Sequence, residues 1–434
     1  MTRNIRVLIL ILVATQLIQS QTLLSVDEAL KTALEKNYGV LMAKNTEQIS
    51  QTQNNLGNAG LSPTVSLNAA YNFANLNSHQ EFNSGVVQDK EGAITKNVAA
   101  SINANWTVFD GLKMFAIKKR LEANQQSANL ALKQQMENLI YQTIVAYNNI
   151  IKVKSLIKSA EQNLILVEER NNLAKVKYNI GSDSKMDYLL AQSNERKIRS
   201  ELSQLQIQLL NAKTALNLLM TKSADNNFET SDSIVVNFNP SIEDLKKTAP
   251  NSNKSILLSK QNEIQFEQSI KEAQAATLPQ IQINTAYNFT RNQSQAGIVF
   301  LNRQAGLNAG LSASWLIFNG NKNAKLVQER KLLFLNQQYN TAQANLQMDA
   351  WLYLQYEVFL LNKKSLAYEY ESLQMAKEVL EISLKRYQLG KTNFIETLDM
   401  QNVYEAAQSR YINALYNLKV GETDLMKTAG ILIK

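Results

Sequence analysis

The motif Trp106-Thr107-Val108-Phe109-Asp110-Gly111 precedes 69 residues, 112–180, that contain neither glycine nor proline. It recurs as Trp315-Leu316-Ile317-Phe318-Asn319-Gly320 before a second such stretch, 321–389, at an offset of 209 residues. A repeated segment with repeated boundaries indicates an internal duplication. At ~1.5 Å per residue, each stretch could form a helix on the order of 100 Å long. Both stretches end in Tyr-x-x-Gly, at the same offset: Tyr178 to Gly181 and Tyr387 to Gly390.

Hydrophobic residues recur every seven positions in the second stretch: Leu352, Phe359, Leu366, Leu373, Leu380 and Tyr387. A sustained heptad predicts helices packed along their length with coiled-coil geometry. After each Tyr-x-x-Gly the pattern predicts a returning helix, over 183–222 and 392–429. A further helix is expected over 24–61, with Ser25 and Glu28 forming a capping box at its start.

The residues before each motif alternate between apolar and polar with a period of two. They predict four strands, at about 63–75, 97–109, 279–291 and 304–318. Strands of this length match those that cross a bilayer, which need ~9–11 residues each. The offset between the copies falls from 216 to 209 across the hairpin loop, so the second loop is seven residues shorter.

Four strands cannot close a barrel, and an open sheet edge is not tolerated in lipid. Several chains must therefore combine their strands, giving eight from two chains or twelve from three. The asparagines that alternate with apolar residues are expected to face the lumen: Asn103, Asn105, Asn284 and Asn288.

The N-terminus has the features of an export signal. Arg3 and Arg6 precede the apolar run 7–13, and cleavage is expected near Ser20. That run is too short for a spanning helix, and no later segment supplies one. The chain has no cysteine, which excludes disulfides and a lipid-modified cysteine anchor.

These observations divide the chain into a signal peptide, 1–20, and two structural repeats, 21–240 and 241–434. Each repeat is predicted to contain a helix, a β-hairpin, a very long helix and a returning helix. The expected fold class is mixed α and transmembrane β.

Catalysis, cofactor binding and nucleic-acid binding have little support in the sequence. With one histidine and no cysteine, the chain lacks a nucleophile–histidine pair, a His/Cys metal site and a glycine-rich phosphate loop. The formal charge of +8 is scattered rather than gathered in a basic run with aromatic residues. We therefore expect no enzyme activity, no cofactor, no metal and no nucleic-acid partner.

The arrangement resembles the TolC-like outer-membrane channel family, which serves efflux and type I secretion in Gram-negative bacteria. The resemblance covers almost the whole mature chain. It rests on 24–30 (LSVDEAL), on Leu278-Pro279-Gln280-Ile281, and on 386–390 (RYQLG) with Leu398-Asp399. It implies a homotrimer with a twelve-stranded β-barrel in the outer membrane, continuous with an α-helical coiled-coil tunnel through the periplasm.

The resemblance also implies functional residues at the periplasmic end of the tunnel. In that family an acidic ring lies six and nine residues after the second glycine, which corresponds here to Glu396 and Asp399. In the first copy the equivalent positions are Asp187 and Leu190, so one acid is kept. The gate would lie at the two turns, with the residues Tyr178, Gly181, Tyr387 and Gly390.

A tyrosine at the position of Tyr387 ties neighbouring helices together in some family members. The basic residue that some members carry two positions after the glycine is Thr392 here. Arg386 or Lys391 is the candidate substitute.

Four aromatic residues at the strand ends suit either an interfacial girdle or packing at the junction between strand and helix: Trp106, Phe109, Trp315 and Phe318. The predicted function is a passive exit duct that works with a periplasmic adaptor and an inner-membrane RND or ABC pump, in contact with outer-membrane lipid. The alternative is a secreted coiled-coil structural or adhesive protein.

Overall fold

The structure is a computed structural model that describes residues 23–182 and 184–433 of the 434-residue chain. The predicted signal peptide, 1–20, lies outside the described residues. Contacts divide the chain into two compact units. Of the described residues, the first unit contains those up to Lys44, those within Ala131–Leu257 and those from Ala344 onward; the second contains Asn45–Leu130 and Leu258–Gln343. Both sequence repeats therefore contribute to both units.

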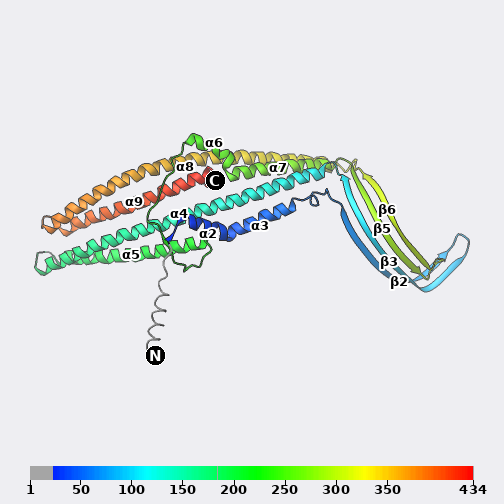
Figure 1. Cartoon of the computed structure of the whole chain (residues 1–434), viewed down its shortest axis with the longest axis horizontal. Coiled ribbons are helices and arrows are strands. Elements are labelled where there is room, and N and C mark those ends of the chain that lie inside the picture. Colours follow the sequence, from blue (N-terminus) through cyan, green and yellow to red (C-terminus); the bar gives the residue numbers. More distant parts are fainter. Residues whose placement is uncertain (1–22, 183, 434) are drawn as a thin grey trace, which may run out of the picture. The chain divides into compact units, whose positions relative to one another are not determined.

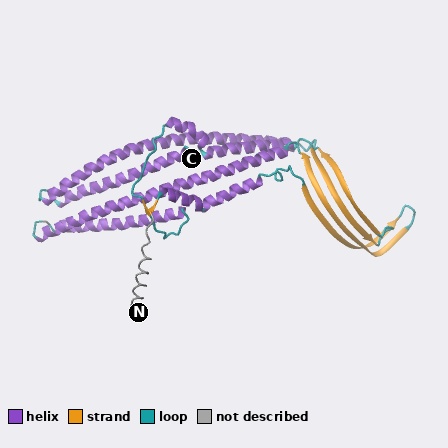
Figure 2. Cartoon of the chain, in the orientation of Figure 1, coloured by secondary structure: helices purple, strands orange, loops and turns teal. Residues whose placement is uncertain are grey.

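Helices make up most of the described chain (Figure 1 and Figure 2). The first repeat contains α2 (Val26–Lys36), α3 (Tyr38–Gln53), α4 (Lys113–Asn179) and α5 (Lys185–Leu219). The second contains α6 (Ile242–Ser252), α7 (Lys254–Ala275), α8 (Lys322–Gln388) and α9 (Phe394–Thr428). The long helices α4 and α8 have 67 residues each, and the returning helices α5 and α9 have 35 each. Among the described residues, no helix has both the length and the apolar character of a membrane span.

The prediction of a single helix over 24–61 is wrong, because the chain breaks at Asn37 between α2 and α3. The Asn37 backbone is extended, its side-chain amide donates to the Leu219 carbonyl at 3.0 Å, and its Oδ1 accepts from the Gly39 amide at 2.9 Å. Asn253 makes the same break between α6 and α7 and donates to the Thr428 carbonyl at 2.9 Å. A short polar side chain that bonds to nearby backbone competes with helical hydrogen bonds. The capping box of Ser25 and Glu28 is confirmed.

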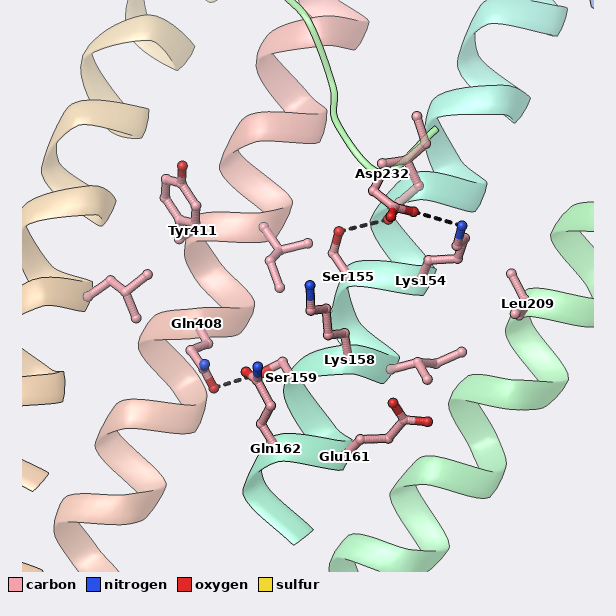
Figure 3. A pocket seen from close by; sticks show the side chains of 14 residues that line it. Lys154, Ser155, Lys158, Ser159, Glu161, Gln162, Leu209, Asp232, Gln408 and Tyr411 are labelled. Atoms are coloured by element: carbon pink, nitrogen blue, oxygen red, sulfur yellow. Dashed lines mark hydrogen bonds and ion pairs between the residues drawn. The ribbon is translucent and has the colours of Figure 1, made fainter. Parts of the chain in front are cut away.

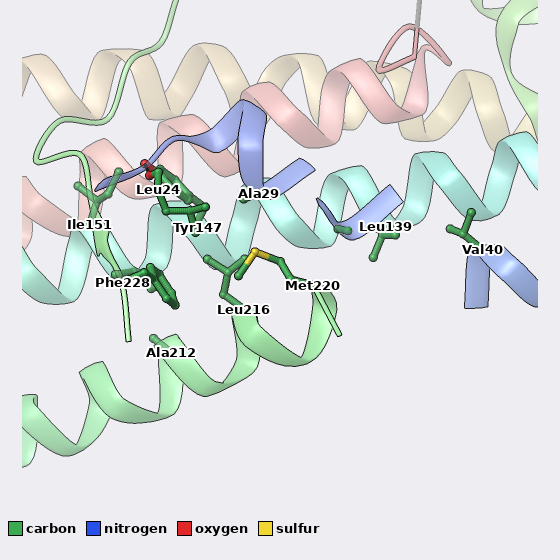
Figure 4. Packing of buried hydrophobic residues seen from close by; sticks show 12 residues of the cluster. Leu24, Ala29, Val40, Leu139, Tyr147, Ile151, Ala212, Leu216, Met220 and Phe228 are labelled. Atoms are coloured by element: carbon green, nitrogen blue, oxygen red, sulfur yellow. Dashed lines mark hydrogen bonds between the residues drawn. The ribbon is translucent and has the colours of Figure 1, made fainter. Parts of the chain in front are cut away.

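The helical unit has duplicated hydrophobic cores. In the first, Ala29 of α2, Ile151 of α4 and Leu216 of α5 are buried together (Figure 4). The corresponding cluster in the second repeat packs Ala249, Phe359 and Leu425. The two-residue strands β1 (Leu23–Leu24) and β4 (Glu229–Thr230) pair in parallel and attach the linker between the repeats to the first core. The heptad positions thus bury one stripe of each long helix against its returning helix.

The other unit contains a four-stranded antiparallel sheet in the order β2-β3-β5-β6. Its strands are β2 (Thr64–Glu81), β3 (Val87–Phe109), β5 (Gln280–Ser294) and β6 (Leu301–Ser314). The edges of the sheet, β2 and β6, have no further strand partner in the described chain. The sheet therefore presents two open edges.

Strand bounds differ from the sequence pattern at two places. The first hairpin extends beyond the predicted strands: β2 continues to Glu81 and β3 begins at Val87, and His79 lies within β2 opposite Asp89. The fourth strand ends at Ser314, so Trp315 and Phe318 follow the strand instead of lying in it. Ser314 pairs with Gln280, the first residue of β5, and Pro279 before it has no N–H to extend the ladder.

Candidate functional site at the helix turns and the sheet

Each long helix ends in the same kind of turn. Gly181 and Gly390 have φ angles of +77° and +69°, and each donates its N–H to the carbonyl of the tyrosine three residues before it. The backbone N–H of the residue after each glycine donates to a carbonyl in the last turn of the long helix. For Lys391 the acceptor is the Arg386 carbonyl, at 2.8 Å. Because only glycine adopts positive φ without steric cost, the glycine of Tyr-x-x-Gly sets the reversal of the chain.

The two gate tyrosines have different surroundings. Tyr387 is buried, with 1% of its surface exposed, and lies edge-on to Phe394 with 6.2 Å between ring centroids. It belongs to a small cluster that includes Ala174 of α4 and Ala191 of α5. Tyr178 is partly exposed and stacks on Tyr188 at 5.8 Å. Tyr387 therefore joins the two helical hairpins within one chain, whereas the Tyr178 ring stacks within its own hairpin.

Two cations of α4 cover the aromatic rings of the second hairpin. The Lys177 ammonium lies 4.0 Å from the Tyr387 ring centroid and donates to the Tyr387 carbonyl at 3.3 Å. The Arg170 guanidinium lies 4.9 Å from the Phe394 ring centroid. Contacts of this kind contribute ~0.5–2 kcal/mol each, and more when water is excluded. The cation on Tyr387 thus comes from a residue 210 positions away, which the heptad pattern alone does not indicate.

Burial shifts the pKa values of two charged groups next to this cluster, Arg170 and Glu405. Arg170 is 4% exposed, and its two terminal nitrogens make no hydrogen bond in the described chain. Burial lowers the pKa of Arg170 to about 10, against the opposing effect of the Glu405 carboxylate. Burial also raises the pKa of Glu405, although Gln401 donates a hydrogen bond to it at 2.6 Å. The hairpins thus enclose an oppositely charged pair of groups in a poorly solvated region.

The three predicted acidic residues differ in what they bind. Asp187 closes the capping box of α5 by accepting from Ser184. Glu396 accepts from the Thr392 hydroxyl, and its carboxylate lies 3.8 Å from the Arg386 guanidinium. Asp399 is exposed on α9, and its side chain makes no hydrogen bond or ion pair in the described part of the chain. Of the three, Asp399 therefore has the least compensated charge.

A groove of about 680 Å³ in the same unit is lined by residues of α4, α5, α8, α9 and the linker (Figure 3). Lys154 binds the linker there, with its ammonium 2.8 Å from Asp232 and 3.1 Å from Glu229. Burial acts to lower the pKa of Lys154, but the hydrogen bonds to these carboxylates raise it overall. Elsewhere in the groove, Ser159 donates to Gln408 at 2.7 Å. Lys154 and its two carboxylate partners thus attach the linker to α4.

The two faces of the sheet differ in chemistry. Asn105 and Asn284 are direct cross-strand partners, and Asn103 and Asn288 lie on the same face because alternate residues share a face. A complete row of asparagines, which the sequence pattern did not reveal, crosses this face in register: Asn72, Asn97, Asn292 and Asn302. Within one strand the spacing of asparagine shows no such row, because the row depends on the registers between strands.

The opposite face is apolar and exposed. Leu67, Ile102, Tyr287 and Leu307 form one cross-strand row on it, and each is at least half-exposed. At the end near the helices, the Trp106 indole donates to the Leu61 carbonyl at 3.1 Å.

The remaining predicted girdle residues lie near that end too. The Trp315 indole donates to the Thr277 carbonyl at 3.0 Å, which mirrors the bond of Trp106. Phe109 closes β3 opposite Ile281, and Phe318 is largely exposed. Both tryptophans therefore combine an exposed ring with a satisfied N–H, as amphipathic residues at a membrane interface do.

Each repeat thus joins a helical hairpin to two strands that have one apolar, exposed face. Residues 29–221 and 245–431 match the family model described as outer membrane efflux protein. The chain belongs to the outer membrane efflux protein family. It is accordingly an efflux protein of the outer membrane of a Gram-negative bacterium and extends into the periplasm. No curated protein sequence matches it significantly.

Solved outer-membrane proteins share the fold at low sequence identity. The Campylobacter jejuni CmeC outer membrane channel superposes with a TM-score of 0.81 at 14% identity, over 93% of this chain and 85% of CmeC. The outer membrane protein VceC of Vibrio cholerae gives 0.80 at 14%, over 93% and 96%. The open state of the Neisseria gonorrhoeae MtrE outer membrane channel gives 0.76 at 17%, over 93% and 88%.

Proposed function

We propose that three copies of this chain form a passive exit duct, in which their sheets close into one twelve-stranded barrel in the outer membrane. The observation that carries the proposal is the sheet itself, with an apolar exposed face, an uncharged polar face and two open edges. Lipid does not tolerate unpaired edges, and pairing β6 of one copy with β2 of the next removes all of them. The number three is the one that the resemblance to TolC-like channels implies.

In this assembly each repeat supplies one hairpin per chain and two helices of a coiled-coil tunnel through the periplasm. The repeats are 21–240 and 241–434, after removal of a signal peptide at 1–20. The polar face, with Asn103, Asn105, Asn284 and Asn288, lines the lumen. The aromatic residues at the helix end of the sheet, Trp106, Phe109, Trp315 and Phe318, form the girdle at the periplasmic interface.

The narrowest point of the tunnel lies at the turns that contain Gly181 and Gly390. Three copies of Glu396 and Asp399 bring six carboxylates around one aperture, with Asp187 nearby on the first hairpin. Like charges in a narrow ring repel each other and attract cations, which makes the ring an electrostatic filter. The Tyr387 cluster, with Lys177 and Arg170 over its rings, holds the two hairpins together in the closed state.

In this proposal the duct is passive, so the energy for transport comes from partners. We propose a periplasmic adaptor that docks on the turns and an inner-membrane RND or ABC pump behind it. Each turn exposes a large apolar residue directly before its glycine, Ile180 at 73% and Leu389 at 70% exposure. In the proposed assembly, these two residues give the adaptor one apolar contact at each turn.

Channel recordings in planar bilayers test the duct and its aperture together. Purified wild-type protein is expected to run as a heat-modifiable trimer and to form channels that divalent cations block. Changing Glu396→Ala and Asp399→Ala together removes the carboxylates and shortens the side chains, so conductance is expected to rise and block to weaken. Because Glu396 is already paired with Thr392 and Arg386, Asp399→Ala alone is expected to have a larger effect on block than Glu396→Ala.

Two outcomes would count against these assignments, and they can be told apart. Unchanged conductance and block in the double variant would remove the acidic aperture and leave the duct intact. A soluble, elongated wild-type protein without channel activity would refute the duct itself.

A further inference from the structure

Apart from the extension of the first hairpin, the sheet carries three charged side chains, and all three are basic. Residues 64–76, 93–109, 280–294 and 301–314 contain Lys96, Arg291 and Arg303 but no aspartate or glutamate. All three are exposed, and none makes an ion pair in the part of the chain that the structure describes.

The three cations lie together on the apolar face. Arg291 and Arg303 are direct cross-strand partners in β5 and β6, and such partners have Cβ atoms ~4.5–5.5 Å apart. Lys96 of β3 is opposite Gln293, two residues from Arg291, so it is a diagonal neighbour of Arg291. Alternation places all three on the face of Ile102 and Tyr287, not on the asparagine face. Like charges directly opposite one another destabilise a sheet unless an anion neutralises them.

The position of the cluster along the strands indicates where that anion is found. On the same face, Arg291 lies eight residues beyond Ile283, the cross-strand partner of Trp106. Eight residues span ~26 Å of strand, which rises ~19–22 Å along the membrane normal when the strands are tilted by ~35–45°. The apolar band of an outer-membrane barrel is ~25 Å tall, and long basic side chains can extend over the remaining few Å to the headgroups. The cluster therefore lies at the far end of the band from the helices. Tyr71 shares the row of Arg291, and Phe73 shares the row of Lys96.

We infer that Lys96, Arg291 and Arg303 form a binding site for the phosphate groups of an anionic lipid in the outer leaflet. The inference rests on the proposed barrel, which sets the apolar face against lipid. Charge complementarity selects the occupant, because the three cations make no ion pair in the described part of the chain and, in the proposed barrel, face the level of the headgroups. Guanidinium groups bind phosphate through two parallel hydrogen bonds, and the lysine adds a third charge at short range.

Binding of a defined lipid to the purified full-length trimer tests the site. The probe is fluorescent bisphosphorylated lipid A, compared with its dephosphorylated form and with inorganic phosphate as competitor. A basic residue near an anionic surface contributes ~1 kcal/mol, so loss of three is expected to weaken binding about a hundredfold. That is the expected result for the variant Lys96→Gln, Arg291→Gln, Arg303→Gln.

The matched control changes Lys322→Gln, Lys325→Gln and Lys331→Gln, which removes the same charge from exposed positions of α8 and should leave lipid binding unchanged. Replacing only the two arginines by lysine keeps the charge but loses the bidentate geometry, so intermediate binding is expected. Trimer formation and channel conductance, measured on the same samples, report on the proposed duct separately.

Several results would overturn the inference. Equal binding of the phosphorylated and dephosphorylated lipids to the wild-type trimer would do so without any variant. Displacement of the lipid by millimolar inorganic phosphate would identify a free-anion site instead. Loss of trimer stability in the glutamine variant regardless of the lipid present would show that the cations pair with protein groups of a neighbouring copy.

Discussion

At the scale of single residues, the closed hairpins depend on a contact that joins the two repeats. Lys177 lies on the face of Tyr387 and donates to its backbone, while Tyr387 packs with Ala174 and Ala191. The sequence around Gly390 suggested Arg386 or Lys391 as the basic partner of this tyrosine. Arg386 instead faces Glu396. The tyrosine is thus held by the helix of the first repeat.

Replacing Lys177 should loosen this contact without disturbing the turns. Lys177→Gln removes the cation–π attraction, of ~0.5–2 kcal/mol, and is expected to raise the open fraction of single channels. Lys175→Gln is the matched control, because Lys175 is exposed two residues away on the same helix. Equal open fractions in the two variants would show that the lysine on Tyr387 does not stabilise the closed hairpins.

Other single residues could not be located from the sequence. Asn37 and Asn253 interrupt patterns that otherwise read as helix, and they do so because each reaches a carbonyl at the end of a returning helix. Arg170 has the appearance of a surface charge on a heptad helix, but it is buried above Phe394. Each of these three residues contacts a partner more than 170 residues away in the sequence, so local periodicity does not identify the contact.

At the scale of elements, the linker between the repeats is attached by charge. Its residues Glu229 and Asp232 bind Lys154 of α4, and Glu229 also binds Lys213 of α5 at 3.0 Å. The hydrogen bond from Lys154 lowers the pKa of Asp232. For Glu229, burial acts to raise the pKa, but hydrogen bonds from Lys213 and Lys154 lower it overall. A carboxylate whose pKa is lowered on folding contributes stability above its unfolded pKa and loses it as the pH falls.

The attachment of the linker should therefore weaken in acid. The ordinary pKa is 4.5 for a glutamate such as Glu229 and 3.8 for an aspartate such as Asp232, and protection of the linker is expected to fall as the pH drops below these values. Amide hydrogen exchange of residues 223–240, corrected for the intrinsic rate at each pH, measures this. Lys154→Met should lower protection at pH ~5 and reduce its further loss toward pH ~3.

Lys158→Met provides the comparison for this prediction and is expected to have a smaller effect, since Lys158 lines the same groove and acts on Asp232 only by coulombic attraction, without a hydrogen bond. Protection that stays constant on acidification of the wild-type protein would contradict the ionic attachment.

The long helices were within reach of sequence reasoning, since they follow from the absence of glycine and proline together with a continuous heptad. The extension of the first hairpin was not. Residues 77–94 are mostly polar, so no alternation marks them as strands, and pairing between β2 and β3 holds them. β6 ends before Trp315 because its neighbour β5 begins at Gln280, the partner of Ser314. The alternation within β6 itself gives no sign of this end.

At the scale of the whole molecule, the duplication predicts how copies join. Within one chain, Ala104 of β3 is opposite Thr285 of β5. The repeat offset of 209 residues relates Ala104 of β3 to Ala313 of β6, and the offset of 216 residues relates Thr285 of β5 to Ala69 of β2. The equivalent pair is therefore Ala313 and Ala69. If neighbouring copies repeat the internal pairing, these two alanines lie opposite each other across every subunit boundary.

Disulfide formation between copies tests this register. The chain has no cysteine, so a variant with Ala313→Cys and Ala69→Cys introduces only the two intended thiols. Direct cross-strand partners have Cα atoms ~4.5–5.5 Å apart, within the range of a disulfide, and a covalent trimer is expected on a denaturing gel without reductant.

The control for register is Ala313→Cys with Val65→Cys, which moves one cysteine four residues, or ~13 Å, along β2. Crosslinking of the control alone would place the boundary in another register. Efficient crosslinking of neither pair, in protein shown to be trimeric, would refute the shared geometry of internal and intersubunit pairing.

The unequal lengths of the two hairpins have a consequence for the cell surface. In a closed assembly, the longer first hairpins and the shorter second hairpins would alternate around the extracellular end of the barrel. The first hairpins would therefore project beyond the second. Phages, antibodies or toxins arriving from outside would meet residues 77–94 before any other part of the sheet. Mutations selected by such encounters can accumulate in that projecting hairpin while the conduit below it keeps its lining.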